Sequence, residues 1–289
     1  MRFHVDFHSE RILSFQNLWS GWVEWNCRAP PHLSLSRSGG RRRVWAMKQF
    51  LLMIAVVMGQ SVLASDEKPL IANPVVEKAI RGKLNKPTGK FTEADLIKVK
   101  NLNLRDKGLT DIRSLAGLSE LEVLSLGNNK VKDLSILKHL RELKELRLDG
   151  NQLTNIDTLP ELDRLGALFL ENNAIADLRP ILRLKNLTNL SVGGYDQVDF
   201  ATIWKLNKLE VLGIAGSDLT NEKLAVVPNE LPNLKHLFVC YNPKISNLLP
   251  LATFKKLEII DVDALPNLRI QIETLQKSLP KLKARYYFP

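Results

Sequence analysis

The chain of 289 residues is short of the residues and motifs that most active sites need. It has two cysteines, Cys27 and Cys240, and five histidines. It contains no G-x-S-x-G elbow, phosphate-binding loop, H-E-x-x-H motif or paired-cysteine metal signature. These absences argue against the common hydrolases, nucleotide-binding enzymes and zinc proteins. We therefore predict a protein without catalysis, metal or cofactor.

Long apolar runs are also scarce, and the one near the N-terminus has the form of a secretory signal. From Met47 the chain reads MKQFLLMIAVVMGQSVLA, with a lysine, an apolar stretch and small residues before Ser65. The stretch is shorter than the ~20 residues of a membrane span. We interpret residues 47–64 as a signal peptide, and residues 1–46, which hold four of the five tryptophans, as a mis-called extension. The alternative is an uncleaved signal anchor behind the basic segment Arg41–Arg43, which would keep the chain on the membrane.

Cleavage after Ala64 leaves 225 residues (289 − 64). Their net charge is +5, because residues 1–46 carry +4 and Lys48 carries +1 of the total of +10. This weak and dispersed positive charge does not indicate a nucleic-acid partner. Cys240 is the one cysteine left after cleavage, so an internal disulfide cannot form. We expect an exported monomer, periplasmic, secreted or at the cell surface, that packing alone stabilises.

An internal repeat dominates the remaining sequence. Its units begin at Val99, Leu121, Leu143, Leu165, Leu187, Leu209, Leu234 and Leu257, at intervals of 22 residues and finally of 25 and 23. Apolar residues recur three and five positions after each start. Four units have asparagine eight positions after it, at Asn129, Asn151, Asn173 and Asn242. This is the leucine-rich-repeat pattern L-x-x-L-x-L-x-x-N.

The pattern predicts how each unit folds. The alternating segment is typical of a short strand, and the later leucines of a return by turns or short helix. The asparagines are expected to form a structural ladder, because an amide at the turn can bond the backbone of neighbouring turns. One unit cannot bury its own apolar face, so units must stack. The predicted fold class is an α/β solenoid, a leucine-rich-repeat horseshoe with a concave parallel β-sheet and a helical N-terminal cap.

The flanking segments carry a resemblance to a known family. NPVVEKAIRGKLNKPTGKFTEADLIKVKNLNL, from Asn73, resembles the N-terminal cap of bacterial internalin-type proteins. Asn73 and Pro74 suit the start of a helix. Thr92 and Asp95 form a capping-box pattern, with Asp in place of the usual Glu or Gln. At the other end, IETLQKSLPKLKARYYFP predicts a helical turn, a break at Pro280 and an edge strand.

These features give the predicted organisation of the chain. The extension covers residues 1–46 and the signal peptide residues 47–64. A linker and N-terminal helical cap follow over residues 65–98, then about eight leucine-rich repeats over residues 99–270 and a C-terminal cap over residues 271–289.

Strand residues that point out of the concave face are the expected binding surface, because side chains alternate along a strand. Phe169 and Phe238 lie three strands apart, roughly 14–15 Å, with small residues between them. Aromatic anchors are common at binding surfaces. The alternative is that each ring lies flat over the backbone of its neighbour. The predicted ligand-binding residues are Arg147, Phe169, Glu171, Tyr195, His236, Phe238, Tyr241, Asp261 and Asp263.

Two of these positions carry further expectations. Tyr195 stands where other units have the ladder asparagine, and a phenol ring cannot make the same inward bonds. The loop Gly193–Asp196 is therefore predicted to depart from its neighbours and to push Tyr195 outward. Asp261 and Asp263 share one strand face, where they form either a cation site or an ordinary solvated acidic surface.

The function that these observations favour is a secreted or periplasmic, non-catalytic module that binds a protein or another ligand through its concave sheet. The internalin resemblance implies a protein partner. One alternative is a regulatory scaffold subunit of a phosphatase-type complex, since cytoplasmic relatives use the same 22-residue repeat. The other is an enzyme with an unrecognised site.

Overall fold

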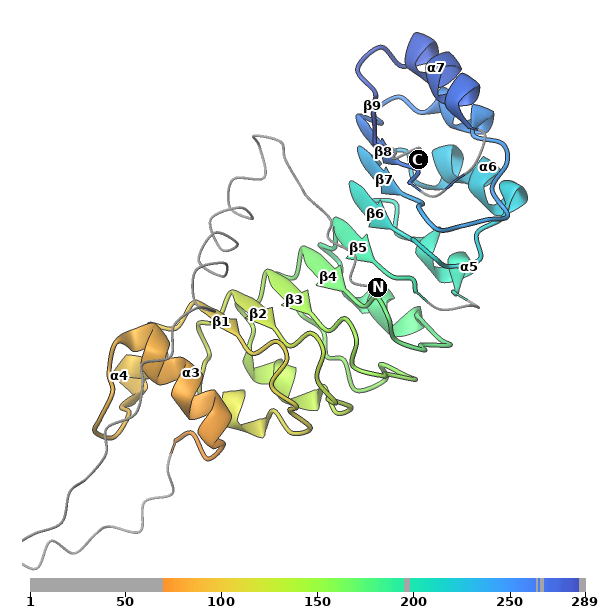
Figure 1. Ribbon diagram of the computed structural model, residues 1–289. Helices are drawn as coiled ribbons and strands as arrows, with labels where there is room; N and C mark the ends of the chain where they lie inside the picture. The colour runs from red at the N-terminus through yellow and green to blue at the C-terminus, as the bar shows by residue number, and fades with distance from the viewer. Residues whose placement is uncertain (1–69, 195–197, 264, 266–267, 286–289) are drawn as a thin grey trace, which may run out of the picture. The chain divides into compact units, whose positions relative to one another are not determined.

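One parallel sheet runs along the whole repeat region (Figure 1). The computed structural model describes residues 70–194, 198–263, 265 and 268–285. Within these residues nine strands pair in chain order, each with the next. The strands are β1 (Asn101–Asn103), β2 (Val123–Ser125), β3 (Glu145–Arg147), β4 (Ala167–Phe169), β5 (Asn189–Ser191), β6 (Val211–Gly213), β7 (His236–Phe238), β8 (Ile259–Asp261) and β9 (Lys283–Arg285).

The repeat pattern explains both the strands and their register. The middle residue of each strand from β1 to β8 lies three positions after the unit start and is apolar. Leu124 of β2, for example, pairs with Leu102 and with Leu146 on its two neighbours. All three are buried, whereas the residues on either side of Leu124 are half-exposed. Because side chains alternate, one face of the sheet points into the core and the other is open.

The rest of each unit returns the chain on the side opposite the strands (Figure 1). Four of the returns contain short 3₁₀ helices, at Arg113–Leu115, Ser135–His139, Arg179–Arg183 and Leu249–Thr253. The fifth unit uses α5 (Phe200–Ile203), and the sixth uses α6 (Asn221–Glu230). The ten residues of α6 account for the longer interval of that unit.

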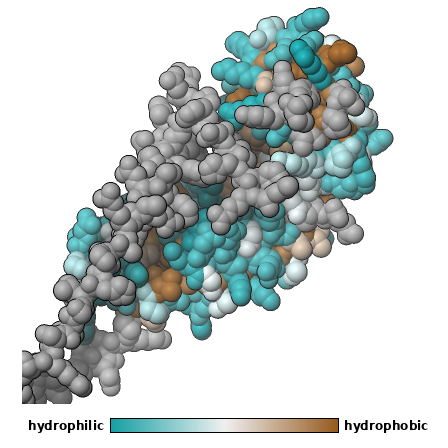
Figure 2. Space-filling model, in the orientation of Figure 1, coloured by the Kyte–Doolittle hydropathy of each residue, from teal (hydrophilic) through white to brown (hydrophobic). Residues whose placement is uncertain are grey.

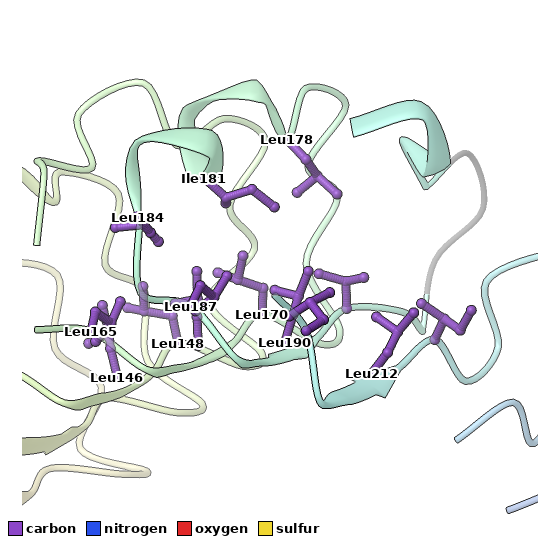
Figure 3. Close-up of a cluster of buried hydrophobic side chains, with 14 of the residues drawn as sticks. Leu146, Leu148, Leu165, Leu170, Leu178, Ile181, Leu184, Leu187, Leu190 and Leu212 are labelled. Atoms are coloured by element: carbon purple, nitrogen blue, oxygen red, sulfur yellow. The ribbon is translucent and has the colours of Figure 1, made fainter. Parts of the chain in front are cut away.

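The leucines between the sheet and the returns form a continuous core. Figure 3 shows strand residues such as Leu146, Leu190 and Leu212 in one layer and return residues such as Leu178 and Ile181 in the layer that faces it. These side chains are at most 1% exposed. The surface visible in Figure 2 is largely hydrophilic, with apolar residues in small patches, as expected when the leucines turn inward.

Helices precede the first strand, as the sequence predicts. Helix α3 (Pro74–Leu84) begins after Asn73, whose side chain accepts hydrogen bonds from the backbone N–H of Val75 and Val76. Helix α4 (Glu93–Leu96) has a complete capping box, in which Asp95 takes the place of the longer Glu. Val76 and Ile80 of α3 are buried and join the core.

The C-terminal segment is more helical than predicted. It forms α7 (Arg269–Ser278), ten residues in place of a single turn. Pro280 follows, and β9 then pairs with β8 as the last strand of the described sheet.

The predicted solenoid of stacked units with one parallel sheet and a helical N-terminal cap is confirmed by these elements.

Some predictions concern residues outside the described ranges. The extension 1–46, the signal peptide 47–64 and the placement of Tyr195 all fall there. None of the helices in the described part of the chain has the length and apolar character that a membrane span requires.

Candidate functional site

The candidate site is the face of the sheet that points away from the core, hereafter the open face. It consists of the residues two, four and six positions after each unit start. The middle positions form one row across the strands because the strands are in register. This row reads Asn103, Ser125, Arg147, Phe169, Ser191, Gly213, Phe238, Asp261 and Arg285.

The asparagines hold the turns that leave this face. The Asn129 side-chain amide donates to the carbonyls of Leu104 and Leu126 at 2.8 and 2.7 Å, and its oxygen accepts from the Leu109 N–H at 2.9 Å. Asn151, Asn173 and Asn242 repeat this arrangement, and all four are at most 4% exposed. Each amide links its own unit to the one before it. In the sixth unit the buried Ser217 hydroxyl stands in this row and donates to the Ile214 carbonyl.

In the seven units where the structure describes it, the residue just before the asparagine position adopts a left-handed backbone. Its φ angle lies between 53 and 72° at Asp106, Asn128, Gly150, Asn172, Gly194, Gly216 and Tyr241. Six of these are Gly, Asn or Asp, which tolerate this conformation, and Tyr241 is the bulky exception among the units described. The repeat pattern contains a preference for Gly, Asn or Asp at this position, but its meaning is recognised only when the backbone angles are known.

Two ion pairs and an aromatic ring build a hollow at the N-terminal end of the open face. The Arg105 Nη1 lies 2.5 Å from Asp149 Oδ2, although the two residues belong to the first and third units. Gly127 of the unit between them makes this bridge possible, because a Cβ there would lie 2.3 Å from Arg105 Nη1. The Arg147 Nε donates to Glu145 Oε1 at 2.7 Å, and its guanidinium lies 4.2 Å from the centre of the Phe169 ring.

An open hollow of about 250 Å³, which we name the charged hollow, is lined by Arg105, Arg147, Asp149, Phe169, Glu171 and Asn172. The sequence had predicted Arg147, Phe169 and Glu171 as site residues but missed Arg105. One alternative was that the Phe169 ring only covers the backbone of its neighbour. The ring also contacts a side chain, because the Arg147 guanidinium lies over it.

Glu171 is more enclosed than a residue on an open sheet is expected to be. Its Oε2 is buried without a hydrogen-bond partner. Burial raises the pKa of the Glu171 carboxyl, and a hydrogen bond with Ser191 opposes that rise. The nearby Asp149 charge also raises this pKa, and Arg147 lowers it.

The other predicted residues within the described ranges lie at the C-terminal end of the open face: His236, Phe238, Tyr241, Asp261 and Asp263. Phe238 is half-buried between Gly213 and Asp261 on the neighbouring strands. Burial also shifts the pKa of three groups in this region. It lowers the pKa of His236 and raises the pKa of Asp261. It raises the pKa of the Cys240 thiol to about 12. Cys240 is therefore a neutral thiol at physiological pH and is not a ready nucleophile.

Small residues form the floor between the two ends. A Cβ on Gly213 would lie 2.4 Å from the Ser191 hydroxyl, and a Cβ on Gly193 would lie 2.2 Å from the Ala215 carbonyl oxygen. Gly193 also has a φ of +140°, a conformation that other residues rarely adopt. At Gly193 a larger residue would clash with the backbone of the neighbouring unit, so this part of the floor needs glycine.

The arrangement does not form a recognisable catalytic centre in the described residues. His139 lies in a 3₁₀ return and His236 on a strand, so the two do not meet. No group of three or more potential metal ligands occurs in the part of the chain that the structure describes. Whether the predicted residues bind a ligand stays a prediction.

Comparisons with known proteins agree with this architecture. The sequence model described as "Leucine Rich repeats (2 copies)" matches residues 97–139 and 119–161. Among solved structures, an internalin (InlF) of Listeria monocytogenes matches with a TM-score of 0.60 at 22% identity, over 76% of this chain and 65% of that protein. Internalin C2 of the same organism matches with a TM-score of 0.53 at 27% identity, over 66% of this chain and 93% of that one. The comparison with curated proteins found no match.

The chain therefore contains leucine-rich repeats and folds as a solenoid similar to those of the internalins. It spans slightly less than two thirds of the length of the InlF structure.

Proposed function

We propose that the chain is an exported, non-catalytic binding module that holds a protein partner on the open face of its sheet. The observation that carries the proposal is the placement of Phe169 and Phe238 on that face. The core needs neither ring, because the inward positions of the same strands are filled by buried Leu168 and Leu237. Half-buried aromatics on a sheet surface are typical anchors for a partner.

The floor between the rings supports the same conclusion. Ser191, Gly193, Gly213 and Ala215 leave the sheet backbone within reach of a partner's side chains, and the rings stand at either side. The exported state is part of the proposal and depends on the predicted signal peptide, residues 47–64.

The test compares capture of envelope and extracellular proteins by the full chain and by two variants, with quantitative mass spectrometry. Phe238→Ser removes an anchor from the open face. Ile270→Ser is the matched control, because Ile270 is 78% exposed on α7, on the return side of the sheet. Truncation of a binding hot spot costs about 2 kcal/mol or more, roughly a 30-fold loss of affinity.

We expect Phe238→Ser to lose the specific partner at an almost unchanged melting temperature, and Ile270→Ser to retain it. Equal capture by all three proteins would refute binding through this face. A strongly lowered melting temperature for Phe238→Ser, with normal capture once folded, would make the ring structural.

A further inference from the structure

We propose that the charged hollow binds a positively charged group of the partner, the guanidinium or ammonium of an arginine or lysine side chain, with Glu171 as its acceptor. This inference rests on the proposed function, because the partner that supplies the group docks on the open face. It extends that proposal by naming the chemistry of one contact, which lies beside strands β3 and β4.

The first reason is that one oxygen of the Glu171 carboxyl lacks a hydrogen-bond donor, although Ser191 hydrogen-bonds the carboxyl group. Among the side chains that the structure describes, Glu171 Oε2 is the one buried oxygen or nitrogen without a hydrogen-bond partner. An ionised carboxylate can only accept hydrogen bonds. Leaving a buried acceptor unpaired is unfavourable, so the oxygen has a use for a donor that the described chain does not supply.

The second reason is the charge of the surroundings. The other charged residues that line the hollow already have partners, Arg105 with Asp149 at 2.5 Å and Arg147 with Glu145 at 2.7 Å. An anionic ligand would face the carboxylates of Asp149 and Glu171. An uncharged donor would fill the hydrogen bond but leave the carboxylate charge uncompensated. A cation with N–H donors satisfies both needs.

The third reason is that the solenoid does not require a carboxylate at this position. Glu171 lies six residues after its unit start, and in the next two units the same position holds Gly193 and Ala215. Those units stack and pair as the fourth unit does. The wall of the hollow also suits a cation, since the Phe169 ring already accepts the Arg147 guanidinium at 4.2 Å.

The experiment uses two defined peptides and the full chain. One probe is acetyl-Gly-Ser-Arg-Ser-Gly-amide, and the other carries citrulline, which has nearly the same shape without the charge, in place of arginine. Binding is followed by NMR titration of the amide signals of Asp149, Glu171 and Asn172 at pH 7. Glu171→Gln is the test variant, and Glu161→Gln is the control, because Glu161 is exposed and lies outside the open face.

We expect the arginine peptide to bind at least roughly tenfold more tightly than the citrulline peptide, since hydrogen bonds to charged groups contribute about 1.5–3 kcal/mol. Glu171→Gln should remove that difference and Glu161→Gln should keep it. Affinity should fall as the pH is lowered, because protonation of Glu171 removes its charge. Asp149 and Arg147 of the neighbouring strand face the same carboxyl and oppose each other in their effect on its pKa.

Equal affinity for the two peptides, no binding of either, or unchanged binding by Glu171→Gln would overturn the inference. Partner capture then separates the two proposals. If Phe238→Ser abolishes capture while Glu171→Gln leaves it intact, the open face is the binding surface and the cation contact is wrong. If neither substitution affects capture, the proposed function fails as well.

Discussion

At the scale of single residues, Tyr241 occupies a backbone conformation that its side chain disfavours. Its φ of +57° matches those of Asn128 and Asn172 at the same place in other units. A left-handed backbone costs roughly 1–2 kcal/mol for an ordinary L-residue, and less for asparagine. Tyr241 is also 49% exposed at the edge of the open face, where a large ring is useful to a partner. Strain of this kind is often retained at functional sites.

We predict that Tyr241→Asn raises the free energy of unfolding by about 1 kcal/mol, because asparagine adopts this conformation more readily. In a chain of this size such a gain raises the melting temperature by about 2–4 °C, measurable by calorimetry. The matched control is Asn128→Tyr, which introduces the same strain into the second unit and should lower the melting temperature. If Tyr241→Asn melts below the wild type, the contacts of the tyrosine outweigh the strain.

Glu171 gives a second prediction, in which stability depends on pH. Its pKa is raised in the folded chain, chiefly by burial, so the ionised carboxylate destabilises the fold at neutral pH. Glu171→Gln should therefore unfold at higher temperature at pH 7, by about 1 kcal/mol of stability. The advantage should shrink as the pH falls through the raised pKa of the folded state. It should vanish below the ordinary value of 4.5, where both states are protonated.

Melting curves of Glu171→Gln and wild type between pH 4 and pH 8 provide the measurement. A constant difference over that range would show that the carboxylate is not destabilised by its surroundings. Together with the peptide titration, this variant tests whether stability and binding oppose each other at one residue.

At the scale of elements, the asparagine ladder joins each strand turn to the next. Asn151 donates to the carbonyls of Leu126 and Leu148, both at 2.9 Å, and its oxygen accepts from the Val131 N–H at 3.0 Å. Its own N–H donates to Asn173. The side chain is fully buried, so solvent cannot replace these bonds.

We predict that Asn151→Leu destabilises the chain by several kcal/mol, because each buried partner left unpaired costs about 1–3 kcal/mol. Denaturant unfolding measures the loss. Asn189→Ala, at a half-exposed position of β5 outside the ladder row, provides a comparison for a polar deletion. An Asn151→Leu variant as stable as wild type would mean that the turns do not depend on the ladder.

The strictly repeated positions explain why these elements could be predicted from the sequence. Leucines at fixed offsets specify the strands and their register, and Asn73 with Pro74 marks the start of α3. Arg105 could not be found this way, because its bond to Asp149 spans 44 residues and depends on the missing side chain of Gly127. The enclosure of Glu171 depends on three-dimensional surroundings that no offset in the repeat reveals. The strain at Tyr241 lies at a fixed offset, but it is recognised only once the backbone angles are known.

At the scale of the whole molecule, the stacked units contact chiefly their neighbours, so the two ends of the core need cover. Helix α3 supplies it before β1, with Val76 and Ile80 buried. Helix α7, with Ile272 and Leu275 buried, and strand β9 supply it after β8. The stability of the open face therefore depends on both caps, although neither cap contributes the aromatic residues Phe169 and Phe238 of that face.

The first anchored residues of the N-terminal cap bear on the predicted export. Ile71 is 3% exposed, and the Asn73 N–H donates to the Ser114 hydroxyl at 3.0 Å. Cleavage after Ala64 leaves these residues in place.

We predict that the exported protein begins at Ser65, and that a chain expressed from Ser65 melts at the same temperature as the full-length chain. Amino-terminal sequencing and intact mass of periplasmic or secreted material check the first expectation, and calorimetry checks the second. Recovery of exported protein that still contains Trp19 to Trp45 would contradict cleavage and favour the signal anchor. A lower melting temperature for the chain from Ser65 would show instead that the segment before it takes part in the fold.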